Sequence, residues 1–283
     1  MRIAVASGKG GTGKTTVATS LATALADGGV RLLDCDVEAP DAALYLKPQL
    51  RNRKPVGIMV PVIDAGRCTY CGECAQVCEY HAVAVFGKRT LVFPELCHGC
   101  GSCALVCPEH AITEEFKQMG VLENGLSAQG IDFSHGRLDI GEPMAVPVIR
   151  ELKRWKPASP EVVEIRDAPP GASCPVVETV RGADFALLVT EPTPFGLHDL
   201  RQVVGMVRVM GIPAGVILNR DGTGDEAVES FCAETGLPIL MRIPFERRIA
   251  EALAAGDVLL QVFPEYRSKF LDLYRTIHSM VAQ

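Results

Sequence analysis

The chain has 283 residues, of which 48% are hydrophobic and 22% charged, and its formal net charge is −6. This composition is typical of a folded globular protein, and no block of like charges marks a nucleic-acid-binding surface. No apolar stretch approaches the roughly 18 residues of a membrane-spanning helix, and the first residues do not resemble a secretory leader. We therefore expect a cytoplasmic protein with no membrane insertion and no nucleic-acid partner, in which most of the eleven cysteines hold metal and do not form disulfides.

The first feature along the chain is a glycine-rich loop between two apolar segments. Residues 3–6 predict a buried strand, and residues 17–26 have helical periodicity. The loop between them fits the phosphate-binding pattern G-x-x-x-x-G-K-[ST] from Gly8 to Thr15. In such a loop Lys14 supplies positive charge to the phosphates, and the Thr15 hydroxyl is placed for Mg²⁺. The predicted nucleotide-binding residues are Gly8, Lys9, Gly10, Gly11, Thr12, Gly13, Lys14, Thr15 and Thr16.

A second short strand, residues 30–33, ends in an acidic turn. Asp34 and Asp36 follow the strand directly, and Asp41 lies on the loop beyond. Ligands bind at the carboxyl ends of strands in α/β sheets, so these carboxylates are candidates for contact with Mg²⁺ and its water ligands. A solvated acidic turn is the alternative interpretation, because aspartate is common in loops.

The composition changes sharply between residues 60 and 115, after a basic, proline-containing stretch at 47–59 that we interpret as a linker. Eight cysteines there form two sets with the same C-x2-C-x2-C-x3-C spacing. This spacing is typical of two iron–sulfur cubes in which the fourth cysteine of each set ligates the other cube. The predicted ligands are Cys68, Cys71, Cys74 and Cys107 for the first [4Fe–4S] cluster, and Cys97, Cys100, Cys103 and Cys78 for the second. A pair of zinc sites is the alternative, which the triplets do not favour.

The remainder of the chain predicts more strands and helices. Residues 83–86 and 91–93 predict a hairpin that covers one cluster, residues 116–142 predict strands and hairpins, and residues 143–155 predict a helix. From residue 185 to 283 short apolar strands alternate with helical segments, as in α/β units.

Four further candidate site residues lie in this second half. The strand predicted at 162–165 leads to Asp167, which would hold Mg²⁺ through water, and the N–H of Gly171 in the following loop would sense the γ-phosphate. Cys174 in the same loop is either an inert thiol or an additional cluster ligand. Asn219, at a later strand end, either contacts a nucleotide base or occupies a turn.

The loop from Gly8 to Thr16 resembles the deviant Walker A motif of the MinD, ParA and nitrogenase iron protein class of P-loop ATPases. The resemblance covers residues 1–46 and 143–283, whereas residues 60–115 resemble bacterial two-cluster ferredoxins. It implies that Lys9 reaches across a dimer to the nucleotide of the partner, and that Asp36 orients the attacking water, with Asp34 as its acidic neighbour. It also implies that residues 167–171 form a nucleotide-sensing switch and that Asn219 recognises adenine.

These features together predict an α/β protein with a mostly parallel, doubly wound P-loop NTPase sheet, built from residues 1–59 and 116–283. An inserted α+β ferredoxin-like domain would occupy residues 60–115. The expected function is an ATPase that uses ATP and Mg²⁺, with Lys9, Lys14 and Asp36 as catalytic residues. Its nucleotide-dependent dimerisation, with itself or with a related ATPase, would be coupled to electron transfer through two 4Fe–4S clusters, and a partner protein would exchange electrons or a metal cofactor. The alternatives are a carrier or scaffold ATPase for iron–sulfur or metal-cofactor assembly and, less favoured, a positioning ATPase of the MinD or ParA kind.

Overall fold

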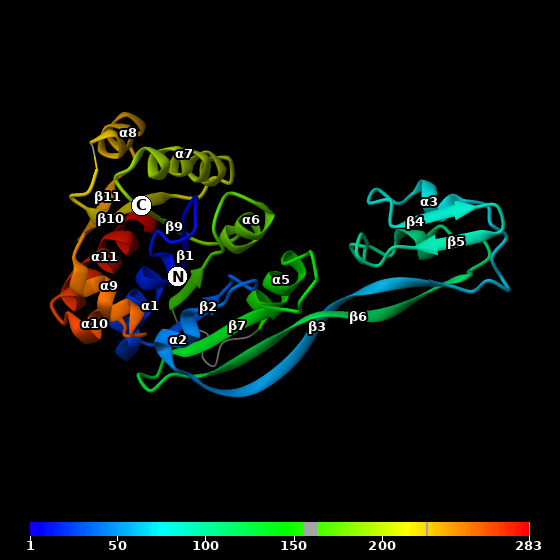
Figure 1. Cartoon of the computed structure of the whole chain (residues 1–283), viewed down its shortest axis with the longest axis horizontal. Coiled ribbons are helices and arrows are strands. Elements are labelled where there is room, and N and C mark those ends of the chain that lie inside the picture. The colour runs from blue at the N-terminus through cyan, green and yellow to red at the C-terminus, as the bar shows by residue number, and fades with distance from the viewer. Residues whose placement is uncertain (156–162, 225, 283) are drawn as a thin grey trace.

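The computed structural model describes residues 1–155, 163–224 and 226–282. They form a broad α/β unit and a small cysteine-rich unit, which a long two-stranded ribbon connects (Figure 1). The predictions made for residues 162, 225 and 283 concern positions outside the described residues. None of the helices in the described part of the chain is long and apolar enough to cross a membrane.

One sheet organises the large unit, and within the described residues it has nine strands in the order β11-β10-β9-β1-β8-β2-β7-β6-β3. The strands from β11 to β7 run parallel to their neighbours, and β6 and β3 add an antiparallel edge. The expectation of a mostly parallel α/β sheet is therefore confirmed. The strands are β1 (Arg2–Ala6), β2 (Val30–Asp34), β3 (Gln49–Ile63), β6 (Ile112–Leu126), β7 (Asp132–Leu138), β8 (Val163–Asp167), β9 (Phe185–Thr190), β10 (Ala214–Asp221) and β11 (Ile239–Pro244).

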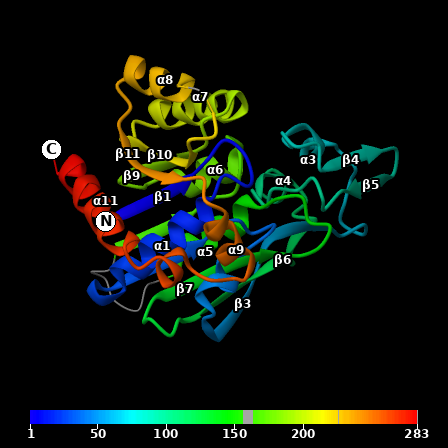
Figure 2. The same ribbon diagram turned by 60° about the vertical axis from the view of Figure 1, so that its left-hand side comes forward.

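Helices cover both faces of the sheet, which explains why the central strands are continuous apolar runs. One face packs against α1 (Lys14–Leu25), α2 (Ala42–Leu46), α9 (Arg247–Ala254), α10 (Leu259–Val262) and α11 (Tyr266–Val281). The other face packs against α5 (Val146–Arg154), α6 (Cys174–Val180), α7 (Pro194–Val209) and α8 (Ala227–Thr235). Figure 2 shows the two helical layers with β1 between them. Phe133 and Phe185 are fully buried in the first layer and mark the centre of the core.

The prediction of a linker at residues 47–59 is wrong, because β3 begins at Gln49 and pairs with β6 along its whole length. The stretch tolerates Arg53, Lys54 and Pro55 because β3 is an edge strand, where one side has no strand to bond and charges discourage aggregation. The ends of β3 and β6 that lie beyond β7 leave the sheet as the ribbon (Figure 1). The expected domain limits at 59/60 and 115/116 fall inside these two strands.

The cysteine-rich unit at the tip of the ribbon repeats one local fold twice. It contains α3 (Glu73–Gln76), α4 (Ser102–Leu105) and the hairpin of β4 (Val83–Phe86) with β5 (Arg89–Val92), which agrees with the hairpin predicted there. Gly72 and Gly101 adopt left-handed conformations before the two helices, with φ values of 85° and 74°. His81 and His110 do the same after them, with φ values of 52° and 46°. The repeated cysteine spacing is thus matched by a repeated backbone.

Candidate functional site

The glycine-rich loop joins β1 to α1 and depends on glycine at three positions. Gly11 and Gly13 have φ values of 75° and 95°, which side chains with a Cβ rarely adopt. A Cβ on Gly13 would lie 2.4 Å from Nδ2 of Asn219, and a Cβ on Gly8 would lie 2.3 Å from the carbonyl oxygen of Asp199 in α7. Backbone therefore packs directly against neighbouring elements, and the loop N–H groups remain near the start of α1, where phosphate is stabilised.

The end of β10 holds this loop through two hydrogen bonds. Asn219 Nδ2 donates to the carbonyl oxygen of Thr12 at 2.7 Å, and Arg220 Nη2 donates to that of Gly11 at 3.0 Å. Arg220 Nη1 also contacts Glu191 at 2.8 Å, and the same carboxylate pairs with the Lys9 ammonium. Lys9, expected to reach toward a second subunit, is thus held by Glu191 of its own chain.

Lys14 lies at the centre of the loop and is only 7% exposed. Its ammonium is 3.4 Å from the carbonyl oxygen of Lys9. Burial lowers the pKa of Lys14, and the nearby carboxylates of Asp167 and Asp36 oppose that change. A buried cation with few partners is well suited to bind an anionic phosphate.

Two buried carboxylates, Asp34 and Asp167, end the neighbouring strands β2 and β8, but their environments differ. Asp34 accepts the backbone N–H groups of Asp36 at 3.2 Å and Ala42 at 3.0 Å, so it shapes the turn that follows β2. Neither carboxylate oxygen of Asp167 has a hydrogen-bond partner among the described residues. Burial, and then the charge of Asp167, raises the pKa of Asp34 well above its ordinary value.

Burial raises the pKa of Asp167 to about 7, although the nearby Thr15 hydroxyl and the Lys14 charge oppose the change. Its two oxygens have no partner among the described residues and lie at the strand end, close to Lys14 and Asp36, where carboxylate oxygens suit a divalent cation. The residues present therefore suit Mg²⁺. Asp36 is half-buried beside this carboxylate, and burial raises its pKa as well.

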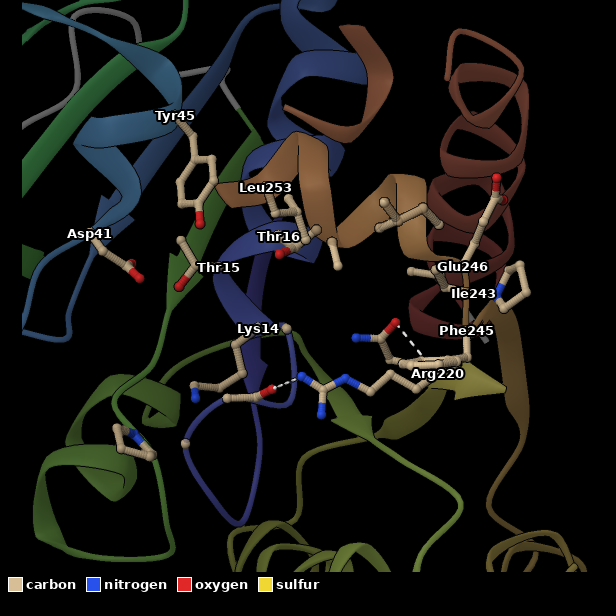
Figure 3. Close-up of a pocket in the computed structure, with 18 of the residues that line it drawn as sticks. Lys14, Thr15, Thr16, Asp41, Tyr45, Arg220, Ile243, Phe245, Glu246 and Leu253 are labelled. Carbon is tan, nitrogen blue, oxygen red and sulfur yellow. Dashed lines mark hydrogen bonds between the residues drawn. The ribbon is translucent and has the colours of Figure 1, made fainter. Parts of the chain in front are cut away.

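A cavity of about 320 Å³ opens above the loop (Figure 3). The loop forms one wall, and Asp41 with Tyr45 of α2 forms another. The third wall runs from the end of β11 into α9 and is largely apolar, with Phe245 and Leu253 among its side chains. A polar end that suits phosphate and an apolar end that suits a flat base together match a nucleotide.

Most of the predicted residues line this cavity, namely Gly10, Gly11, Gly13, Lys14, Thr15, Thr16, Asp36 and Asn219. Gly8, Lys9, Thr12, Asp34, Asp167 and Gly171 do not line the cavity, whereas Pro170 does. No sequence pattern indicated that Tyr45, Arg220, Glu191 and the segment from Ile243 to Glu246 would contribute to this site. The position of that last segment, at the carboxyl end of a parallel strand, is the signal that could have found it.

A family model, the nucleotide binding domain of the CobQ/CobB/MinD/ParA proteins, matches residues 3–260. The chain belongs to this family. An uncharacterized protein of Methanocaldococcus jannaschii is 31% identical over 264 residues, which cover 92% of each chain. The iron-sulfur cluster carrier protein of Aquifex aeolicus is 26% identical over 306 residues, covering 99% of this chain and 67% of that protein. The septum site-determining protein MinD of Pyrococcus horikoshii OT3, solved with Mg-ADP, matches with a TM-score of 0.58 at 20% identity and covers 96% of this chain and 93% of that chain.

The resemblance inferred from the glycine-rich loop is thus confirmed at the level of the CobQ/CobB/MinD/ParA family. The structural match with MinD establishes a shared fold at low identity. The cavity above the loop is therefore the candidate nucleotide-binding site of this family member.

The ribbon carries a second candidate site, formed by two small cavities in the cysteine-rich unit. One cavity is lined by Cys68, Cys71, Cys74 and Cys107. The other is lined by Cys78, Cys97, Cys100 and Cys103. The fold thus brings the fourth cysteine of each set to the other triplet. Val85 of the β4–β5 hairpin lines the first cavity and Val83 the second, so the hairpin contributes to both and not to one.

Backbone amides surround these thiols in a way that suits thiolate ligands. The N–H groups of Ala82 and Ala111 donate to the sulfurs of Cys78 and Cys107, each at 3.3 Å. Such N–H···S bonds stabilise negative charge on sulfur and tune a cluster's potential. Within the described residues no compact group of three His, Cys, Asp or Glu side chains forms a single-ion site. The cysteines instead border hollows, and a donor set of four thiols around a hollow fits an iron–sulfur cube.

The remaining cysteines occupy two different environments. Cys35 and Cys232 are buried in the core, and burial raises the pKa of their thiols to about 12 and about 11. Cys174 is exposed and is the first residue of α6, directly after the loop that follows Asp167. It is therefore the accessible thiol near the nucleotide end of the sheet.

A row of ionisable side chains crosses the sheet from the nucleotide site toward the ribbon. Asp167 of β8 is in register with Asp34 of β2, which is in register with His135 of β7 and then with Glu123 of β6. His135 Nε2 is 3.1 Å from Glu123, whereas its buried Nδ1 has no partner among the described residues. Glu123 in turn lies 3.8 Å from Arg53 of β3. The row ends on the two strands that continue into the ribbon.

Proposed function

We propose that this chain is a Mg²⁺-dependent ATPase whose nucleotide state and dimerisation are coupled to electron transfer through two [4Fe–4S] clusters. The observation that carries the proposal is the pair of four-cysteine cavities at the tip of a ribbon whose strands also belong to the nucleotide-binding sheet. Bound clusters of this type would each accept or donate one electron. Residues 60–115 would be the cluster-bearing unit of the chain.

In the nucleotide site, Lys14 and the loop N–H groups would neutralise charge on the β- and γ-phosphates. Thr15 and, through water, Asp167 would hold Mg²⁺, which adds positive charge at the same phosphates. Each carboxylate oxygen of Asp34 accepts one backbone N–H of the turn after β2, so its contribution would be to position the turn that carries Asp36. Asp36, at the cavity wall, would orient the attacking water.

Asn219 has the capacity to recognise adenine despite its existing contacts. Its Nδ2 donates one hydrogen to Thr12, and its Oδ1 accepts the N–H of Arg220 at 3.0 Å. One Nδ2 hydrogen and one Oδ1 lone pair remain, and this pair matches the N7 acceptor and N6 donor of adenine. The proposed nucleotide is therefore ATP.

Dimerisation would require Lys9 to exchange its present partner. Lys9 now pairs with Glu191, which also contacts Arg220 at 2.8 Å. Because Arg220 stays beside Glu191, the carboxylate would remain compensated when Lys9 moves to the phosphates of a second subunit. The exchange would thus leave no buried charge unpaired.

The row from Asp167 to Glu123 supplies a physical route between the two candidate sites. Binding of a cation and phosphates would change the charge balance at Asp167, and register neighbours in a sheet cannot move independently. We propose that the resulting shift of Glu123 and Arg53 changes the direction of the ribbon and thereby the exposure of the cysteine-rich unit.

The test begins with the anaerobically purified chain, analysed for iron, sulfide and zinc and by electron paramagnetic resonance. Two cubic clusters are expected, and their reduction potentials are then measured with and without a non-hydrolysable ATP analogue. A potential or reduction rate that changes with the analogue supports the coupling, and Glu123→Gln should diminish that change. Glu115→Gln, an exposed change on the same strand, is the matched control. Identical potentials and rates in both nucleotide states would rule out the coupling.

A second function, delivery of iron–sulfur or metal cofactors, is favoured by one specific observation. Cys174 is exposed at the start of α6, where the loop after Asp167 would move with the nucleotide. Relatives named iron-sulfur cluster carrier proteins agree with this alternative. If Cys174 of two subunits held a shared, labile cluster, an apo-acceptor would receive it, and Cys174→Ala would abolish the transfer. Unchanged iron content and unchanged transfer in Cys174→Ala would exclude this function for the thiol.

A further inference from the structure

A second large cavity lies at the amino ends of the strands, whereas the candidate nucleotide site lies at their carboxyl ends. It is bordered by α5, α6 and the first residues of β1, β2 and β8, and its volume is about 870 Å³. Its lining is mainly cationic, although the chain as a whole has a net charge of −6. Trp155, at the end of α5, forms part of the wall.

On the helical side of this cavity one carboxylate faces three cations. Glu178 of α6 lies 3.2 Å from Lys153, 3.5 Å from Arg150 and 3.6 Å from Arg181. The last two distances exceed good hydrogen-bond length, and both arginine side chains are more than half exposed, at 51% and 67%. Each guanidinium carries five N–H donors, so Arg150 and Arg181 retain donors that face the cavity without an acceptor among the described residues.

The strand side of the cavity is buried, and its cations are matched by carboxylates. Glu164 is shared by Arg166 at 2.7 Å and Arg31 at 3.8 Å. Arg31 is 1% exposed, and its Nε lies 4.0 Å from Asp132 without a hydrogen-bond partner among the described residues. Around these three carboxylates there are thus five cations, and the two that are more than half exposed are Arg150 and Arg181. An excess of positive charge in a cleft attracts anions to it.

We propose that this cavity binds a multivalent oxyanion of the phosphate ester or polycarboxylate class. Planar guanidinium groups bind the oxygens of both anions in pairs, which matches the arginines that line the site. Two or more negative charges would offset the excess around Glu164 and Glu178. The volume is within the range of sites for small molecules. The cavity is distinct from the phosphate loop, so the proposal stands independently of the ATPase.

The experiment uses Trp155 as the reporter, because it lines the cavity and is the single tryptophan of the chain. Inorganic pyrophosphate and citrate are titrated separately into the full, anaerobically prepared protein at low ionic strength, and tryptophan fluorescence is recorded. At least one anion should give a saturable change. In the double variant Arg150→Gln, Arg181→Gln the affinity should fall by about tenfold or more.

Two control variants distinguish anion binding in this cavity from anion binding at other cationic side chains of the chain. Lys14→Ala removes the phosphate-loop lysine and should leave the Trp155 response intact. Arg275→Gln changes an arginine of α11 that is 73% exposed, and it should also bind normally.

The proposal is overturned if neither anion changes Trp155 fluorescence saturably, or if the double variant binds as tightly as the unmodified chain. Loss of the response in Lys14→Ala would assign the signal to the phosphate loop and also overturn it. If a hexaglutamate peptide binds and neither small anion binds, the proposal is overturned and the cavity is assigned to an acidic protein segment instead. The ATPase activity and the cluster content of the unmodified chain are measured separately from anion binding. Failure of the anion site is therefore distinguishable from failure of the proposed function.

Discussion

Substitution of Asp167 by asparagine should stabilise the nucleotide-free protein while removing its Mg²⁺ site. Asp167 is 1% exposed, and neither of its oxygens has a hydrogen-bond partner among the described residues. Its pKa of about 7 in the folded chain exceeds the ordinary value of 3.8, so the folded state binds a proton more tightly than the unfolded state. The ionised carboxylate therefore destabilises the fold above neutral pH, and this destabilisation disappears as the pH falls below about 4.

The difference between a pKa of about 7 and one of 3.8 corresponds to an upper value of about 4 kcal/mol at alkaline pH. Asparagine has nearly the same shape but carries no charge. We therefore expect Asp167→Asn to increase the free energy of unfolding by about 2–4 kcal/mol at pH 8.5 and by no more than about 1 kcal/mol at pH 4.5.

The assay is denaturant unfolding in EDTA without nucleotide, followed by Trp155 fluorescence. This single tryptophan lies at the end of α5 and reports on the α/β unit and not on the cysteine-rich unit. Asp272→Asn, which alters a 70% exposed carboxylate of α11, is the matched control and should change little. In parallel, Mg²⁺-dependent nucleotide binding should be lost in Asp167→Asn. A variant no more stable than the parent chain at pH 8.5, or equally stabilised at both pH values, would refute the reasoning.

Three further predictions concern individual residues of the two sites. Lys9→Ala should keep nucleotide affinity within about threefold but abolish ATP-dependent dimerisation in light scattering, because the lysine acts on the other subunit; unchanged dimerisation would contradict its role. Cys68→Ser with Cys107→Ser should lose about four of eight irons, whereas Cys68→Ser with Cys78→Ser should lose nearly all; equal losses would contradict the crossed ligation. Asn219→Ala should weaken ATP binding by about tenfold and reduce discrimination against GTP in calorimetry; preserved discrimination would refute adenine recognition.

Local features of the chain were predictable because their physical requirements are local. The phosphate loop needs glycines, a lysine and a hydroxyl within one short run, so Gly8 to Thr15 was recognisable without a fold. The parallel strands were recognisable as apolar runs, since both faces of each are covered. The cysteine spacing likewise encoded which thiols share a cavity, and the structure brings the same sets together.

The errors and omissions have a common cause in long-range pairing. Residues 47–59 have the composition of a linker and become β3 only because β6, far along the chain, offers a strand to pair with. Arg220 and Glu191 carried no motif, yet they hold the phosphate loop and Lys9 once β9 and β10 lie beside β1. The apolar wall from Ile243 to Leu253 joins the site for the same reason.

The sequence by itself determined which chemistry the chain can perform, because phosphate and thiolate sites are built from closely spaced residues. It specified the nucleotide loop, the two cysteine sets and a mostly parallel α/β core. Only the tertiary structure decided how these parts are connected. The cysteine-rich unit stands on a ribbon continuous with the sheet, and Asp167 has no hydrogen-bond partner among the described residues. Five cations gather around three carboxylates at the amino ends of the strands. Each of these depends on strand order and register, which place residues distant in the chain at bonding distance and which no local pattern encodes.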